Sequence, residues 1–159
     1  MEIGTIEKFN IIPNDLDEKE RVLNMVSKDL IAFGQLFLPD DFMKSKPAPF
    51  HYEVGELFLD NTIRRLCLVL PRGHTKSTLA KAALLHRICF NPQGKNEFAA
   101  WVSEEQGQAV DHLKYIKSHI EFNPALNYYF GDMAGNKWTE KEITLSLIHI
   151  SEPTRQAEI

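Results

Sequence analysis

Basic and hydroxyl side chains suited to phosphate binding are concentrated in the segment Pro71–Thr78. Within it, Lys76 is followed directly by Ser77. In phosphate-binding loops such a lysine reaches the β- and γ-phosphates of a nucleotide, and the hydroxyl that follows holds Mg²⁺. Backbone N–H groups of the loop and of the next helix point at the phosphate oxygens. The predicted nucleotide site therefore consists of Gly73, His74, Thr75, Lys76, Ser77 and Thr78, with Ser77 as the metal ligand.

The segments around this loop predict the elements that position it. Arg65–Leu70 is a short, nearly continuous apolar run, which is typical of a buried parallel strand. Helix-forming residues follow the loop and end near Asn91-Pro92. A second pair comes next, with a predicted strand at Glu97–Val102 and a predicted helix from Ser103 to Phe122. Two such units predict an α/β fold of the P-loop NTPase type: a parallel sheet with right-handed crossovers and flanking helices, with the loop at the carboxyl ends of the strands.

The loop departs from the standard pattern G-x-x-x-x-G-K-[ST] at two positions. Leu70 stands at the first glycine, and Thr75 stands at the glycine before the lysine. Because glycine permits a positive φ, we expect Thr75 to adopt a conformation of non-glycine residues and the loop geometry to change accordingly. The alternative is a basic turn between a strand and a helix, with Lys76 merely solvated.

The segment P-R-G-H-x-K-S-T resembles the variant Walker A loop of bacteriophage terminase large subunits, the ATP-driven motors that package viral DNA. The resemblance covers roughly Asp29 to Thr144. It includes Pro49–Tyr52 upstream, Trp101–Ser103, and further downstream Phe130-Gly131 and Trp138. It implies that ATP and Mg²⁺ are the cofactors. It also implies double-stranded viral DNA as a partner of the full-length protein, together with a portal and a small terminase subunit.

The same resemblance implies roles for residues on either side of the lysine. Arg72 would sense the γ-phosphate and act with Lys76 in hydrolysis, since a guanidinium can stabilise charge on the transferred group. Its alternative is a surface arginine paired with a carboxylate. Phe50 and His51 would lie near the adenine. The alternative for this pair is a hydrophobic staple and an exposed residue in the first turn of a helix.

Hydrolysis needs an acid on a second buried strand, and no convincing candidate occurs between Met1 and Thr144. Terminases carry that strand, and a nuclease domain, further along the chain. We therefore expect an ATPase and nuclease as the full-length parent, and only weak nucleotide binding without hydrolysis by this chain. Two alternatives stay open: another P-loop ATPase, such as a helicase-like or DNA-repair motor, and a non-catalytic nucleotide-binding module.

The length and composition of the chain limit the number of domains and the classes of partner. The chain has 159 residues, enough for the core of one domain, and its formal charge of -4 gives no general attraction to nucleic acid. Cys67 and Cys89 are expected to be reduced core residues. No apolar run approaches the length of a membrane span, so we expect no membrane partner and a cytoplasmic location. The resemblance to phage terminases implies that this is the cytoplasm of an infected bacterial host.

The predicted organisation has three parts. Residues 1–62 form an arm and two helices, one from Lys19 to before Pro39 and one over Phe50–Asn61. Residues 63–144 form the first part of the P-loop ATPase domain, ending in a loop at Met133–Lys137 and a strand near Trp138–Leu147. Leu145–Arg155 resembles a translated sequencing adapter, so residues 145–159 are expected to be non-native and the reading frame truncated.

Overall fold

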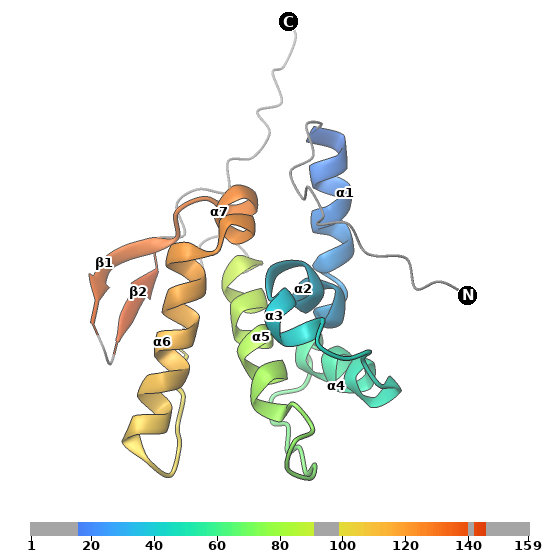
Figure 1. The fold of residues 1–159 in the computed structure, drawn as a ribbon, viewed down its shortest axis with the longest axis vertical. Coiled ribbons are helices and arrows are strands. Elements are labelled where there is room, and N and C mark those ends of the chain that lie inside the picture. The colour runs from blue at the N-terminus through green and yellow to red at the C-terminus, as the bar shows by residue number, and fades with distance from the viewer. Residues whose placement is uncertain (1–15, 91–98, 140–141, 146–159) are drawn as a thin grey trace, which may run out of the picture.

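The computed structural model describes residues 16–90, 99–139 and 142–145, and these form seven helices and one hairpin (Figure 1). The first four helices precede the loop, and the remaining elements follow it. Their bounds are α1 Leu16–Val26, α2 Leu30–Phe37, α3 Pro39–Phe42, α4 Pro49–Leu59, α5 Lys76–Cys89, α6 Gln106–Phe122, α7 Pro124–Phe130, β1 Ala134–Trp138 and β2 Ile143–Leu145.

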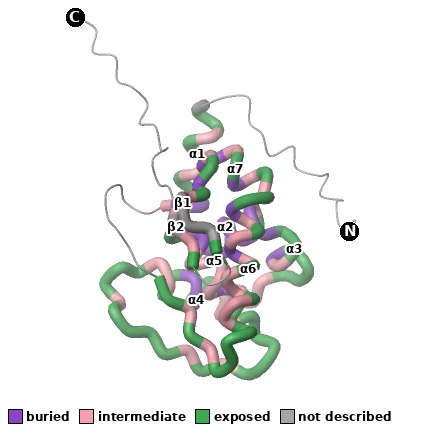
Figure 2. Tube along the Cα trace, turned by 90° about the vertical axis from the view of Figure 1, so that its left-hand side faces the viewer, coloured by how far each residue is buried: buried purple, intermediate pink, exposed green. Residues whose placement is uncertain are grey.

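Helix α2 lies at the centre of the fold. It contacts α1, α3, α4, α5 and α7, and Gln35 is its single polar side chain, as expected of a largely buried helix. Its packing with α4 is close, since a Cβ added at Gly55 would lie 3.3 Å from the Cβ of Leu30. Figure 2 shows buried positions gathered among these helices and long exposed stretches at the end opposite α1 and α7. Helices on both sides of residue 63 therefore share one hydrophobic core.

The helix predicted from Lys19 to Pro39 is two helices, which corrects the sequence interpretation. Chain direction changes after Val26, and Asp29 then begins α2. Its carboxylate accepts hydrogen bonds from the backbone N–H groups of Ile31 and Ala32, at 2.8 and 3.0 Å. An aspartate N-cap of this kind stabilises a helix by about 1 kcal/mol. Because the apolar stripe continues across the turn between α1 and α2, the periodicity of the sequence does not show that there are two helices.

His86 of α5 fixes the end of α1. Its Nε2 lies 3.2 Å from the carbonyl oxygen of Val26 and 3.1 Å from that of Ser27. Carbonyl oxygens only accept hydrogen bonds, so Nε2 carries the proton and donates to them. The side chain is 7% exposed, and burial lowers the pKa of His86 although the two carbonyl groups oppose this shift. The neutral imidazole is therefore part of the folded state.

We expect the free energy of unfolding to fall as the pH drops below about 6.5, the usual pKa of histidine. The pKa of His86 is lowered in the folded state, so the unfolded chain binds more protons and acid favours unfolding. Urea denaturation between pH 7.5 and 5.5 measures this. In His86→Gln the loss over this range should be smaller than in the parent chain. A parent chain whose stability rises on acidification would contradict the assignment.

Asn123 joins α6 to α7. Its Oδ1 accepts from the N–H groups of Ala125 and Leu126, at 3.0 and 3.1 Å, which caps α7. Its Nδ2 donates to the carbonyl oxygen of Phe37 at 2.6 Å, and so ties this junction to the end of α2. Gly131 closes α7 with φ +74, a conformation that glycine adopts without strain. The short turn predicted at Ala125–Phe130 is thus confirmed as a helix.

The two strands form an antiparallel hairpin in which Ala134 faces Leu145 and Trp138 faces Ile143, with an irregularity between the pairs. The loop predicted at Met133–Lys137 is wrong, because β1 occupies most of it. Of the strand predicted near Trp138–Leu147, the described residues that lie in a strand are Trp138, which ends β1, and Ile143–Leu145, which form β2. Lys117 of α6 donates to the carbonyl oxygen of Thr139 at 3.1 Å, which connects the hairpin to α6.

The predicted parallel α/β sheet is contradicted. The described residues are mostly helical, and the hairpin is their only sheet. Neither Arg65–Leu70 nor the described part of Glu97–Val102 pairs with another strand, so neither forms one. Both segments lie largely at the surface: the exposed fraction is 89% at Val69 and 88% at Val102. Among the described residues, neither apolar run has the neighbouring strand with which a strand of a parallel sheet must pair.

The other sequence expectations have mixed outcomes. The helices predicted at Phe50–Asn61, after the loop, and up to Phe122 are confirmed as α4, α5 and α6. Cys89 is buried as predicted, but Cys67 is exposed. The N-terminal arm, the turn at Asn91–Lys95 and the tail after Leu145 lie outside the described residues.

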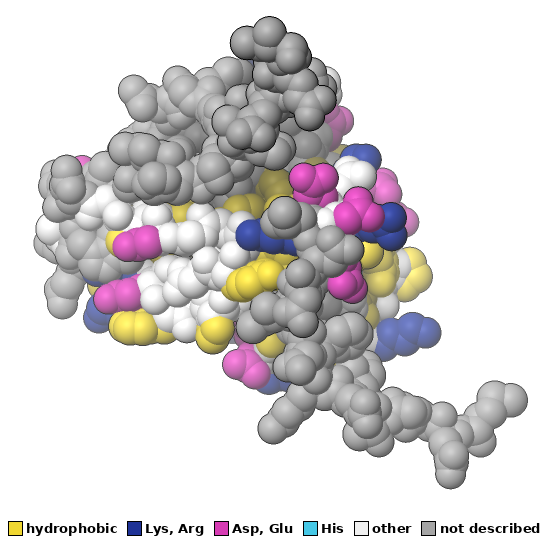
Figure 3. Space-filling model, turned by 90° about the horizontal axis from the view of Figure 1, so that it is seen from above, with side chains coloured by type: hydrophobic (Ala, Val, Ile, Leu, Met, Phe, Trp, Pro, Cys, Tyr) yellow, Lys and Arg dark blue, Asp and Glu magenta, His cyan; other side chains and the backbone are white. Residues whose placement is uncertain are grey.

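No helix in the described ranges combines the length and apolar composition needed to cross a bilayer. On the face drawn in Figure 3, acidic and basic side chains are interspersed, and neither sign forms a continuous patch on its described part. This agrees with the modest net charge of the whole sequence.

Candidate phosphate-binding loop

The candidate site is the turn that leads into α5, at the lower end of that helix in Figure 1. Gly73 has φ +82 and Thr75 has φ +53 with ψ +19, so both residues are left-handed. The expectation that Thr75 adopts a conformation ordinary for non-glycine residues is therefore wrong. This threonine has the positive φ that a glycine would permit at the same place in the standard pattern. For a β-branched residue this costs roughly 1–2 kcal/mol, so its surroundings must hold it there.

His51 of α4 supplies part of that support. The N–H of Ala48 donates to His51 Nδ1 at 2.9 Å, which leaves the ring proton on Nε2. Nε2 lies 2.9 Å from Thr75 Oγ1 and therefore donates to it. Burial, and to a smaller extent His74, lowers the pKa of His51, so the neutral ring that makes both bonds is favoured. The side chain of His51 thus links the start of α4 to the residue before Lys76.

Phe50 and His74 complete an aromatic group beside the loop. The ring centroids of Phe50 and His51 are 4.0 Å apart, and those of Phe50 and His74 are 5.7 Å apart. His74 Nδ1 lies 3.2 Å from the carbonyl oxygen of Arg72, to which it donates. The structure therefore brings Phe50 and His51 to the loop, although 24 residues separate His51 from Thr75 in sequence. Flat rings next to a phosphate-binding turn are a surface on which a nucleobase can stack.

Lys76 folds back over the loop. Its ammonium donates to the carbonyl oxygen of Leu70 and, at 2.8 Å, to that of Pro71. The alternative of a merely solvated lysine does not describe this side chain, which is half-buried. Two neutral carbonyl groups hold the ammonium at the mouth of the turn, and phosphate oxygens are stronger acceptors for it because they are charged.

Backbone donors face the same region. The N–H groups of Lys76, Ser77 and Thr78 make no hydrogen bond to a described residue, and Thr75 provides no side-chain cap. The first N–H groups of a helix have no partner within the helix and carry the positive end of its dipole. Together with Lys76 they form a donor set that fits a phosphate group. For Mg²⁺ the loop offers the exposed hydroxyl of Ser77.

Arg72 is exposed and makes no ion pair with any described carboxylate. The alternative of an arginine paired with a surface acid is therefore not seen within the described ranges. Its guanidinium is available at the same turn as Lys76, although no contact places it on a particular atom.

Asp41 also lies at the loop, although it was not predicted as a site residue. This residue lines a cavity of about 30 Å³ together with His51, Thr75 and Thr78, a volume that suits a single water molecule. Its carboxylate accepts a hydrogen bond from the Tyr115 hydroxyl at 2.5 Å. No periodic or motif signal marks Asp41, because it belongs to the short acidic helix α3, far from the loop in sequence. Asp132 lies in the loop between α7 and β1, where its Oδ1 accepts from the N–H of Ala134.

The open space around Gly73 allows a test of the loop conformation. We expect Gly73→Ala to lower the free energy of unfolding by about 1–2 kcal/mol, because φ is +82 and an added Cβ would meet no atom within 4 Å. The matched control is Gly107→Ala, which also adds a Cβ in open space but lies within α6. Alanine there should be neutral or stabilising by up to about 1 kcal/mol. Equal destabilisation of the two variants in urea denaturation would show that backbone strain is not the cause.

No group of three or more histidine, cysteine, aspartate or glutamate side chains suitable for a metal occurs in the described ranges. Comparisons of the chain with models of known protein families, with curated proteins and with solved structures find no match.

Proposed function

We propose that the turn before α5 binds the β- and γ-phosphates of ATP with Mg²⁺, and that the chain is part of an ATP-driven DNA-packaging motor of the terminase large subunit type. The observation that carries the proposal is the position of Lys76. Its ammonium lies at the N-terminus of a 14-residue helix, within a turn whose residues Gly73 and Thr75 are both left-handed. The motor assignment rests on the resemblance of Pro71–Thr78 to terminases.

The loop residues have distinct roles in this proposal. Lys76 exchanges its bonds to backbone carbonyl groups for bonds to phosphate oxygens, and the N–H groups at the start of α5 bind the same phosphates. Ser77 provides the protein hydroxyl for Mg²⁺, and Arg72 provides a second cation. Phe50 and His51 provide the surface for the adenine. When bound, ATP supplies the phosphoryl group whose transfer to water would drive movement of double-stranded DNA.

A nucleotide-binding module without hydrolysis is the second candidate. It is favoured by one observation: no described carboxylate makes a hydrogen bond or ion pair with Lys76 or Ser77. Asp41, which lines the cavity beneath Thr75, bonds to Tyr115 instead. An acid at the phosphate is required to position the attacking water, so binding and hydrolysis can be separated experimentally.

Equilibrium binding of ATP, ADP and AMP to the chain, each with Mg²⁺ at one fixed salt concentration, tests the proposal. We expect affinity to fall in the order ATP, ADP, AMP, because the contacts are to the β- and γ-phosphates. Equal affinities for the three nucleotides would overturn a site built on those phosphates. Phosphate release from bound ATP, measured with and without double-stranded DNA, then separates the two candidates: release that DNA stimulates supports the motor, and binding with no release supports the module.

A further inference from the structure

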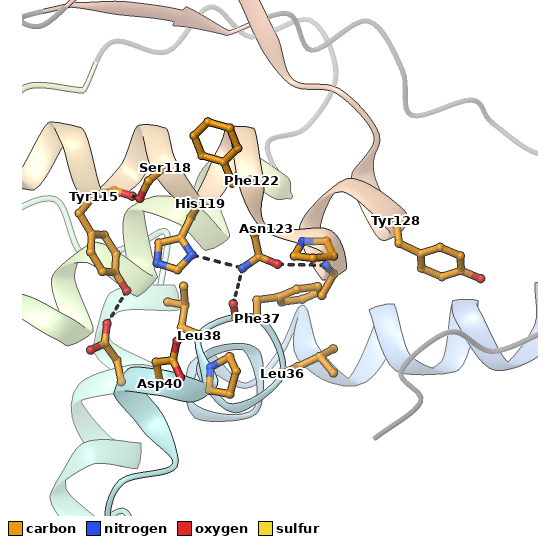
Figure 4. A pocket seen from close by; sticks show the side chains of 14 residues that line it. Leu36, Phe37, Leu38, Asp40, Tyr115, Ser118, His119, Phe122, Asn123 and Tyr128 are labelled. Carbon is orange, nitrogen blue, oxygen red and sulfur yellow. Dashed lines mark hydrogen bonds between the residues drawn. The ribbon is translucent and has the colours of Figure 1, made fainter. Parts of the chain in front are cut away.

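A groove on the side of α3 away from the loop has no role in the proposed function. It lies between α2 and α3 on one side and α6 and α7 on the other, with a volume of about 710 Å³ (Figure 4). This size is within the range of sites that bind small ligands or side chains of a partner. The residues that determine its chemistry are Asp40, Asp41, Tyr115, His119, Phe122 and Asn123.

Negative charge is concentrated at one wall of the groove. Asp40 is exposed and makes no hydrogen bond or ion pair with any described residue, while Asp41 accepts from the Tyr115 hydroxyl. The ammonium of Lys81 lies 3.7 Å from the centroid of the Tyr115 ring, which shows that this ring already contacts a cation. Two carboxylates and one ammonium leave the wall with an excess of negative charge.

The groove also contains a hydrogen-bond donor whose direction can be assigned. Asn123 uses Oδ1 to cap α7, so its Nδ2 is the atom that lies 3.2 Å from His119 Nδ1. Nδ2 can only donate, which leaves His119 Nδ1 without a proton and places the ring proton on Nε2. In Figure 4 this second nitrogen lies on the Tyr115 side of the ring. It makes no hydrogen bond to a described residue.

The rim of the groove is apolar. Phe122, in the last turn of α6, is 70% exposed, a large fraction for a phenylalanine that lines a cavity. Leu36 and Ala125 contribute further apolar surface. A ligand that fits this groove therefore needs a cation for Asp40, an acceptor for His119 and an apolar group for Phe122.

We propose that this groove binds a short segment of a partner protein in which a lysine or arginine stands next to an apolar residue. The cationic side chain lies between Asp40 and Tyr115, a backbone carbonyl group of the segment accepts from His119 Nε2, and the apolar neighbour covers Phe122. The negative formal charge of the whole chain also favours a basic partner. A free amine would match the carboxylate and leave the donor and the apolar rim unused. The proposal is independent of nucleotide binding by Lys76.

The test is an NMR titration of the whole chain with two capped tripeptides, acetyl-Leu-Arg-Leu-amide and acetyl-Leu-Glu-Leu-amide. The arginine peptide should shift resonances of Tyr115, His119 and Phe122, and the glutamate peptide should not. Asp40→Asn should weaken binding of the arginine peptide several-fold. The matched control Glu53→Gln removes an exposed carboxylate from α4, outside the groove, and should leave binding unchanged.

Three results would overturn this proposal. The first is equal binding of the two peptides, or equal binding of the arginine peptide to the parent chain and to Asp40→Asn. The second is binding of spermidine at least as tight as that of the arginine peptide, which would identify a site for free amines. The third is a concentration-dependent dimer that Asp40→Asn dissociates, because the occupant would then be a second copy of the chain. Asp40 is exposed and has no described partner, so its substitution is expected to leave folding intact.

Discussion

Replacing Lys76 by alanine is expected to weaken binding of ATP with Mg²⁺ by about ten- to a hundredfold, the effect of losing one hydrogen bond to a charged group. The ammonium now bonds to the carbonyl groups of Leu70 and Pro71, and in the proposed complex it moves to phosphate oxygens. Isothermal titration calorimetry at fixed salt concentration measures the change. The loss should be large for ATP and ADP and small for AMP.

The control for this variant is Lys114→Ala, which removes the same charge from an exposed position of α6. A general effect of net charge on an anionic ligand would weaken binding in both variants equally, and would contradict a specific role of Lys76. Circular dichroism of both variants checks that the helices are retained. The bonds of Lys76 to two loop carbonyl groups have a charged donor and contribute about 1.5–3 kcal/mol each at most. They hold the loop and not the hydrophobic core, so the helices should be retained.

Replacing Phe33 by alanine is expected to lower the free energy of unfolding by about 3–5 kcal/mol. Phe33 is 0% exposed in the central helix α2, and its ring lies 4.8 Å from that of Phe37 and 5.1 Å from that of His86, centroid to centroid. Its removal leaves a cavity at the point where α1, α2 and α5 are joined. Urea denaturation followed by circular dichroism measures the loss.

Phe122→Ala is the matched control, because it removes the same ring from a site that is 70% exposed. We expect its effect on the free energy of unfolding to stay within about 0.5 kcal/mol. Similar losses in the two variants would mean that α2 is not the centre of the core. A Phe33→Ala chain that is already unfolded without urea would agree with the prediction, and Phe33→Leu then provides a measurable, smaller loss.

Much of the helical structure could be predicted from the sequence, because it depends on local spacing. The helices after the loop and before Asn123 have the expected apolar periodicity and recognisable ends, and they are confirmed as α5 and α6. The division between α1 and α2 was not predictable in this way. Asp29 is an N-cap signal, but the apolar stripe runs on through it and suggests one continuous helix.

The predictions of the two parallel strands were wrong for a different reason. A short apolar run indicates burial, but it does not supply the neighbouring strand that a sheet requires. In Arg65–Leu70 the side chains of Leu68 and Leu70 pack against the core while Val69 is exposed. The segment thus buries one side against helices without pairing. The predicted sheet depended on pairing between distant segments, which composition and local pattern do not determine.

In the candidate loop, too, the features that depend on neighbouring residues could be predicted, and those that depend on contacts with distant residues could not. Its position before a helix and its Lys-Ser pair were readable from the sequence, and Lys76 does lie at the start of α5. The left-handed conformation of Thr75 could not be predicted from the sequence. A β-branched residue disfavours a positive φ, and the hydrogen bond that supports it comes from His51 in another helix. Asp41 was missed because it comes near the loop only through the packing of α3 against α2.

The most direct test of the proposed phosphate site is an NMR titration of the isotope-labelled chain with ATP and Mg²⁺. The account predicts that the largest shifts occur at the backbone N–H groups of Gly73 to Thr78 and at the ammonium of Lys76, with smaller shifts at the rings of Phe50 and His51. Saturable shifts that leave these residues unchanged and appear elsewhere, for example in the groove beside Tyr115, would contradict the assignment of the loop.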